Sequence, residues 1–172
     1  MYQNIIKGRV WKFGDNISTD LIMPGFAALS NPDMTPEDAA KYCMVSNRPG
    51  WASEVKKGDI IIAGRNFGCG SSRPGSKILK ALGISIVVAE SVSRIFFRNS
   101  INLGFAVLTC PGIFERFDEG DLIEVNMNTG VIRSLTNGET IQGEALPEGS
   151  PPEQILRAGG IVPMLEKELA DK

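Results

Sequence analysis

The sequence predicts an α/β fold in which a core of parallel βαβ units is followed by antiparallel β hairpins. Three short apolar runs, residues 58–64, 84–90 and 104–110, have the pattern of strands that are buried on both faces. Helical patterns separate these runs, and this spacing is typical of strands that pair in parallel. After residue 120 the pattern changes to short strands around a tight turn, which predicts antiparallel pairing.

The N-terminal elements follow from local signals. Residues 5–13 are rich in β-branched and aromatic side chains and predict a strand. Residues 18–34 contain two prolines and many small residues, so we expect a long surface loop, a feature that is often functional in compact domains. A helix is expected over residues 35–45, because Thr35 suits the N-cap and Pro36 the first helical position.

The rest of the chain is expected to form further helices and strands that connect or follow the apolar runs. These are a helix over 75–83 that ends at Gly83, a helix from Ser91, a hairpin over 121–135, a strand over 139–146, and two helical segments in 150–172 separated by Gly159-Gly160.

Length, charge and cysteine content limit the class of protein. The 172 residues suit one domain, 1–172, and the net charge of −2 argues against binding to nucleic acid or an anionic membrane. The N-terminus lacks the apolar segment of a signal peptide, so we expect a cytoplasmic protein. Three widely spaced cysteines match neither a disulfide framework nor a metal knuckle. We therefore expect a small-molecule or protein partner, and no metal bound by this chain alone.

The segment "NFGCGSSRPGSK", residues 66–77, is the strongest candidate for a functional site. A glycine-rich turn between a buried strand and a helix gathers backbone N–H groups around one point, which favours an anion. Phosphate is one candidate, but a P-loop requires Gly-Lys-Ser/Thr where this chain has Gly-Ser-Lys. The exchange moves Lys77 by about 100° around the helix, away from a phosphate in that loop.

Nucleophilic catalysis is a second candidate for this loop. Cys69 and Ser71 are potential nucleophiles, but each normally needs an adjacent base, most often histidine. The chain contains no histidine, so a conventional triad requires a base from another subunit. Cys69 is accordingly expected to be a small, buried packing residue.

Carboxylate chemistry is the third candidate. Arg73 offers a planar fork that can bind a carboxylate through two hydrogen bonds. Backbone N–H groups in the loop could hold the Ser71 oxygen in a partly anionic state, strong enough to remove a proton next to a carboxylate. Composition alone does not select this chemistry, because turns rich in glycine, serine and proline are usually only turns.

Two longer segments resemble a known family. "GRNFGCGSSR" with "ALGISIVVAESVSRIFFRNSINLGFAVL", and "GDNISTDLIMPG" nearer the N-terminus, are similar to the small subunits of 3-isopropylmalate dehydratases in the aconitase superfamily. The resemblance covers Lys7 to Leu169. It implies a single swivelling β/β/α domain, equivalent to the mobile fourth domain of aconitases.

The resemblance also implies roles for individual residues. The family's catalytic base falls on Ser71 and its carboxylate-binding arginine on Arg73, with Ser72 and Gly70 as neighbouring substrate-binding positions. Asp20 matches the aspartate that reaches the active site. Family members remove and re-add water on hydroxy acids with a [4Fe-4S] cluster that acts as a Lewis acid. The cluster and its histidine partners lie on a large subunit, so we expect this chain to be inactive alone.

This chain departs from the family pattern in two places. Pro74-Gly75 replaces an acidic position that could orient Arg73. The substrate loop reads Phe26-Ala27-Ala28-Leu29-Ser30 and carries no charge, so Ala28, Leu29 and Ser30 are expected to line a pocket for an alkyl branch.

The sequence thus predicts the small subunit of a heterodimeric or heterotetrameric [4Fe-4S] hydro-lyase that acts on a branched hydroxy-dicarboxylic acid. The favoured reaction converts 2-isopropylmalate to 3-isopropylmalate in leucine biosynthesis. Alternatives are the small subunit of a 2,3-dimethylmalate dehydratase or of a homoaconitase, and a non-catalytic anion-binding or scaffold module.

Overall fold

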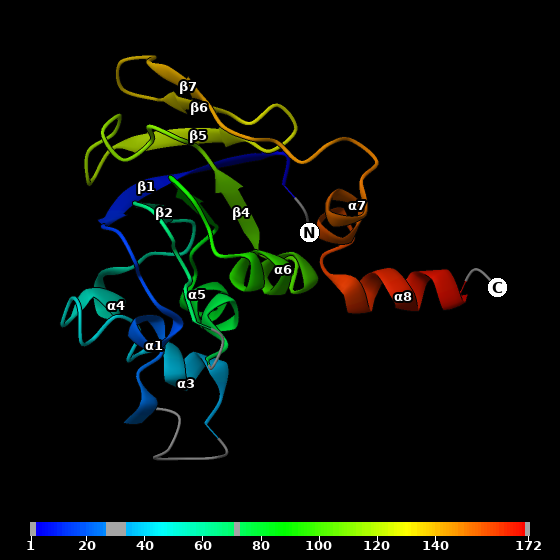
Figure 1. Ribbon diagram of the computed structural model, residues 1–172, viewed down its shortest axis with the longest axis horizontal. Helices are drawn as coiled ribbons and strands as arrows, with labels where there is room; N and C mark the ends of the chain where they lie inside the picture. Colours follow the sequence, from blue (N-terminus) through cyan, green and yellow to red (C-terminus); the bar gives the residue numbers. More distant parts are fainter. Residues whose placement is uncertain (1–2, 27–33, 71–72, 171–172) are drawn as a thin grey trace.

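A mixed seven-stranded sheet organises the molecule (Figure 1). The computed structural model describes residues 3–26, 34–70 and 73–170. The strand order is β4-β3-β2-β1-β5-β6-β7. In chain order the strands are β1 (Ile5–Phe13), β2 (Ile60–Ala63), β3 (Ile86–Ala89), β4 (Ala106–Thr109), β5 (Leu122–Asn126), β6 (Val131–Ser134) and β7 (Thr140–Gln142).

Strand β1 joins a parallel half of the sheet to an antiparallel half. It pairs in parallel with β2, with Val10 opposite Ile60, and antiparallel with β5, with Gly8 opposite Ile123. Strands β2, β3 and β4 continue the parallel half, whereas β5, β6 and β7 form an antiparallel meander. The predicted α/β class, with its parallel core and added hairpins, is therefore confirmed.

The sheet curls until its two edges approach each other. After β7, the N–H of Glu144 donates to the carbonyl of Thr109 at 2.8 Å, an isolated antiparallel bridge to edge strand β4. The antiparallel strands thereby fold over one face of the parallel strands and enclose a core between them. Nothing in the local pattern of residues 139–146 predicts this closure.

Most of the helices pack on the opposite face of the parallel strands. The helices are α1 (Thr19–Ile22), α3 (Pro36–Ala40), α4 (Trp51–Glu54), α5 (Gly75–Leu82), α6 (Arg94–Asn102), α7 (Pro151–Arg157) and α8 (Ile161–Ala170). Alternation along β2 divides its side chains between two cores. Ile61 packs with residues of the helical layer, whereas Ile60 and Ile62 pack with the antiparallel strands and α7.

The last two helices are separated at Gly159-Gly160, as the sequence predicts. Helix α8 contains no buried residue and extends away from the sheet (Figure 1). In the described part of the chain, no helix has the length and apolar character needed to cross a bilayer.

Several element boundaries differ from the sequence prediction. The expected loop over residues 18–34 contains α1, a one-turn helix whose N-cap Ser18 accepts a hydrogen bond from the N–H of Leu21. Helix α3 is shorter than predicted and is followed by turns, and α4 was not predicted. Helix α6 begins at Arg94 rather than at the predicted Ser91. The side chain of Ser93 accepts a hydrogen bond from the N–H of Phe96 and so provides the N-cap.

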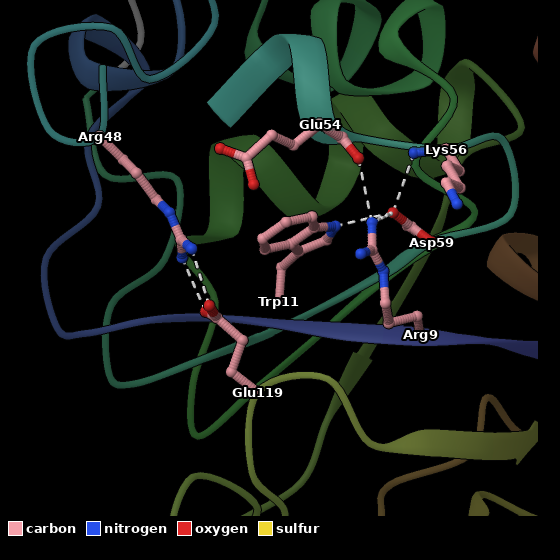
Figure 2. A network of polar contacts seen from close by, with 7 residues as sticks. All are labelled: Arg9, Trp11, Arg48, Glu54, Lys56, Asp59 and Glu119. Carbon is pink, nitrogen blue, oxygen red and sulfur yellow. Dashed lines mark hydrogen bonds and ion pairs between the residues drawn. The ribbon is translucent and has the colours of Figure 1, made fainter. Parts of the chain in front are cut away.

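A polar network fastens β1 to the segment that precedes β2 (Figure 2). One oxygen of the buried Asp59 accepts hydrogen bonds from Arg9 at 2.8 Å, from the indole of Trp11 at 2.7 Å and from the backbone N–H of Lys56 at 2.9 Å. Burial by itself raises the pKa of Asp59, but these hydrogen bonds and the Arg9 charge outweigh it and hold the pKa below its usual value. The network fixes the two strands whose carboxyl ends carry the candidate site.

In the same network, the ring of Trp11 lies between two guanidinium groups. The Arg9 and Arg48 groups lie 4.3 Å and 4.8 Å from the ring centre, and Arg48 also forms two 2.7 Å hydrogen bonds with Glu119. Trp11 and Trp51 are both buried and meet edge to face. Both tryptophans are therefore core residues.

Candidate active site

The glycine-rich segment leaves the carboxyl end of β2 and runs beside the segment that leaves β1. The N–H of Gly68 donates to the carbonyl of Ile17 at 2.7 Å, and the N–H of Thr19 donates to the carbonyl of Cys69 at 2.8 Å. Each bond joins two stretches that are far apart in the chain. Because carboxyl ends of parallel strands meet at one edge of a sheet, both predicted motifs lie at that edge.

Two glycines allow the loop to pack tightly against its surroundings. Gly68 has φ +73°, and a Cβ built there would overlap the ring of Phe96 in α6. Gly70 has φ +84°, and its Cβ would lie 3.1 Å from the hydroxyl of Thr19. Left-handed backbone with no room for a side chain requires glycine at Gly68 and favours it at Gly70.

The connection between β3 and α6 supports the loop backbone. Ser93 donates from its hydroxyl to the carbonyl of Gly68 at 2.6 Å, and the hydroxyl of Ser91 accepts from the N–H of Asn66 at 2.9 Å. The Asn66 amide also donates to the side chain of Asn16 at 2.9 Å. Side chains of the β3–α6 connection thus hold the loop backbone, and Asn16, from the segment after β1, holds the Asn66 side chain.

Arg73 and Asp20 are brought together by the tertiary structure. Nε of Arg73 donates to Oδ1 of Asp20 at 3.2 Å, and the two residues are 53 positions apart. Asp20 belongs to α1, the short helix that the sequence did not predict. A Cβ at Gly25 would lie 3.0 Å from Nη2 of Arg73, so the backbone there approaches the guanidinium closely. Pro74-Gly75 provides no acidic side chain for Arg73. The carboxylate that contacts Arg73 comes from Asp20 in α1 instead.

The Pro74-Gly75 pair starts helix α5. Gly75 is the first helical residue, as the sequence predicts, and Pro74 is the N-cap residue. A Cβ at Gly75 would lie 3.2 Å from Ile22 and 3.4 Å from Phe96. The absence of a side chain therefore lets the helix start pack closely against α1 and α6.

The remaining predicted site residues divide into two groups. Gly70 is exposed at the end of the described loop and lines a groove together with Arg73. The others, Ser71, Ser72, Ala28, Leu29 and Ser30, lie outside the described residues. Their roles stay predictions.

Thr19 and Gly25 are site neighbours that the sequence reasoning did not single out. The Thr19 hydroxyl is buried beside Gly70 and has no hydrogen-bond partner among the described residues. Its position directly before Asp20 is the signal that could have identified it. Gly25 carries no comparable local signal, because only the fold brings it to Arg73.

The three cysteines are free and lie in different surroundings. Cys69 is half-buried rather than buried, with Sγ 3.7 Å from the carbonyl oxygen of Asn16, because the loop follows the sheet edge. Burial raises the pKa of Cys43, and burial followed by the carboxylates of Glu90 and Glu144 raises the pKa of Cys110 to about 11. Cys43 and Cys110 are therefore protonated at neutral pH.

The described residues do not fit an iron–sulfur cluster. Within them, no three side chains of histidine, cysteine, aspartate or glutamate gather to hold a metal ion. Cys43 and Cys110 belong to separate hydrophobic cores on opposite faces of the sheet. The described part of the site instead presents the guanidinium of Arg73 beside a glycine-rich backbone.

Comparison with known proteins identifies the class of domain to which this sheet and its glycine-rich loop belong. The family model described as the aconitase C-terminal domain matches residues 29–112, which include β2, the glycine-rich loop, α5, β3, α6 and β4. The fold and the site thus define an aconitase-type domain.

The relatives extend along nearly the whole chain. The isopropylmalate/citramalate isomerase small subunit of Methanocaldococcus jannaschii is 48% identical over 170 residues, 98% of either chain. The 3-isopropylmalate dehydratase small subunit of Heliobacterium modesticaldum is 44% identical over 95% of this chain and 96% of its own length. A crystal structure of 3-isopropylmalate dehydratase from M. jannaschii superposes with a TM-score of 0.87 at 38% identity, covering 96% of both chains. The chain belongs to the family of 3-isopropylmalate dehydratase small subunits, which are hydro-lyase subunits of the aconitase superfamily.

Proposed function

We propose that the chain is the small subunit of a heteromeric [4Fe-4S] hydro-lyase that converts 2-isopropylmalate to 3-isopropylmalate in leucine biosynthesis. The observation that carries the proposal is the Arg73–Asp20 pair at 3.2 Å, held beside the glycine-rich loop at the carboxyl edge of β2. The family membership supplies the reaction class.

In the proposed reaction, Arg73 binds a carboxylate of the substrate. Asp20 engages Nε, so the edge that carries Nη1 and Nη2 can grip the carboxylate in two hydrogen bonds. Asp20 acts as a positioning residue that holds the guanidinium plane. Gly70 and Ser72 complete the substrate-binding side of the loop.

Ser71 is the proposed base. It removes the proton from the carbon next to the bound carboxylate, while the hydroxyl on the adjacent carbon leaves, so that one water is lost and a double bond forms. Return of the proton and the hydroxyl to exchanged carbons gives the isomer. Loop N–H groups stabilise the serine oxygen as it loses its own proton.

The [4Fe-4S] cluster belongs to the large subunit in this proposal. When bound there it supplies Lewis acidity toward the leaving hydroxyl. The assembly is a heterodimer or a heterotetramer, in which residues 1–172 form one swivelling domain.

A malate with an apolar branch is the proposed substrate. The loop that begins at Phe26 carries no charge that would bind an additional carboxylate. The Phe26 ring is 52% exposed and meets Tyr42 edge to face at 5.8 Å. Because the M. jannaschii relative is named for both isopropylmalate and citramalate, citramalate is a second candidate substrate. 2-Isopropylmalate and citramalate differ in the size of their alkyl branch.

The cytoplasm is the proposed location. All three cysteines are free, which suits a reducing compartment.

The experiment combines the chain with its cognate, cluster-loaded large subunit and measures dehydratase activity on 2-isopropylmalate. Ser71→Ala should lower kcat by about 100-fold or more while the complex still assembles. Ser53→Ala, an exposed serine in α4 away from the site, is the matched control. Full activity of the Ser71→Ala complex contradicts the assignment of the base. Rates on citramalate, 2,3-dimethylmalate and homoaconitate identify the substrate.

A further inference from the structure

The hydroxyl of Thr19 is a buried polar group that the described residues leave without a hydrogen-bond partner. Thr19 is only 3% exposed. Its backbone groups are both paired, because its N–H donates to the carbonyl of Cys69 at 2.8 Å and its carbonyl accepts from the N–H of Met23 at 3.0 Å. A buried hydroxyl that has lost its hydrogen bonds to water and gained none in return destabilises the folded chain.

The local structure gives this hydroxyl no task. Inside a helix, a threonine hydroxyl can donate to the carbonyl three or four residues earlier. Thr19 is the first residue of α1, so no preceding helical turn supplies that carbonyl, and the N-cap hydrogen bond is made by Ser18 instead. Valine would fill nearly the same space without burying an unpaired donor. The hydroxyl is therefore better explained by a ligand than by the fold.

Thr19 lines a groove of about 270 Å³ together with Gly70 and Arg73. Gly70 lies against the hydroxyl, since a Cβ built there would be 3.1 Å from Oγ1 of Thr19. Ser76 lines the same groove, but its hydroxyl is already paired with that of Ser100 at 2.7 Å. Within the described part of the groove, Thr19 thus provides an uncommitted hydroxyl in the same hollow as the guanidinium of Arg73.

We propose that the Thr19 hydroxyl donates a hydrogen bond to the substrate carboxylate that Arg73 binds. The inference rests on the proposed function, which places that carboxylate on Arg73. A carboxylate has about four acceptor positions, and the two bonds from Arg73 leave others for a hydroxyl donor. Gly70 carries no side chain that would block the approach of a carboxylate oxygen. Two adjacent residues of α1 then act on one anion, Asp20 by holding Nε of Arg73 at 3.2 Å and Thr19 directly.

The test compares Thr19→Val, which removes the hydroxyl, with Thr19→Ser, which keeps it. In steady-state assays of the complex with its cognate large subunit on 2-isopropylmalate, Thr19→Val should raise KM by about tenfold or more and leave kcat within about twofold. Thr19→Ser should keep KM within about threefold of the wild type.

Thermal unfolding of the purified chain supplies a readout that a structural role would move in the opposite direction. The midpoint of Thr19→Val should be no lower than that of the wild type, because the substitution removes a buried donor that has no partner among the described residues. Thr140→Val, at an exposed threonine of edge strand β7, is the matched control and should leave KM and kcat unchanged.

The outcomes separate this inference from the proposed function. If the wild-type complex does not act on 2-isopropylmalate, the proposed function fails and the inference falls with it. If that complex is active but Thr19→Val has the wild-type KM, only the inference is wrong. A loss of kcat at unchanged KM would mean that the hydroxyl acts on the reacting atoms rather than on the bound carboxylate. A lower unfolding midpoint for Thr19→Val, with KM raised equally in Thr19→Ser, would mean that the residue is structural. Either result overturns the inference.

Discussion

Replacing Asp59 by asparagine keeps the shape of a buried side chain and removes its charge. A single oxygen of Asp59 accepts all three hydrogen bonds, from Arg9, Trp11 and Lys56, and an asparagine oxygen in its place can still accept them (Figure 2). The loss is therefore the difference between charged and neutral acceptors, about 1 kcal/mol for each bond. Because Arg9 is one-third exposed, solvent screens part of this difference.

The expected cost of Asp59→Asn is about 2–3 kcal/mol in the free energy of unfolding at pH 7. For a chain of this length, that corresponds to a fall of about 5–10 °C in the unfolding midpoint. Calorimetry or circular dichroism of the purified chain measures the shift. Asp38→Asn is the control, since Asp38 is exposed and pairs with Lys41, and it should change the midpoint far less.

The pH dependence provides a second check on the same variant. The pKa of Asp59 in the folded chain lies below its unfolded value, so its stabilisation is complete above the unfolded pKa and is lost as pH falls through the folded pKa. The gap between wild type and variant should stay constant from about pH 6 to 8, narrow below about pH 4, and close as pH falls through the folded pKa. An unchanged midpoint at pH 7, or a gap that persists undiminished in acid, would refute the reasoning.

Two further predictions concern the site. Gly68→Ala should destabilise the chain and abolish activity of the complex, because its Cβ would overlap the Phe96 ring. Gly58→Ala is the control for backbone strain alone, since Gly58 has φ +103° and open space around it. Its effect should be much milder in the same unfolding and activity assays. Asp20→Asn should raise KM for the malate substrate by about two- to fivefold with a smaller change in kcat, because Asp20 orients Arg73, and Arg73→Lys should raise KM further since it loses the planar fork. Equal KM values for the wild-type and Asp20→Asn complexes in steady-state assays would argue against a positioning role.

The sequence predicted the parallel core because burial on both faces leaves a local signature. Short apolar runs that each follow a glycine identify β2, β3 and β4 without reference to their neighbours. The same holds for helix α5, whose end at Gly83 follows from a left-handed cap. Helix α1 was missed because four residues cannot support a helix alone, and its start is held by the bridge between Ser18 and Cys69.

The candidate site also has features that the sequence predicted and features that required the tertiary structure. The glycine-rich loop, Arg73 and Asp20 could be named from the sequence, since the motifs and the family resemblance are local properties of the chain. The pairing of Arg73 with Asp20, the approach of Gly25 to Arg73 and the packing of α5 against α6 required the tertiary structure. Side chains that are 53 positions apart, as Arg73 and Asp20 are, have no shared local signal. They meet only because the carboxyl ends of parallel strands, and the helices that follow them, are brought together at one edge of the sheet.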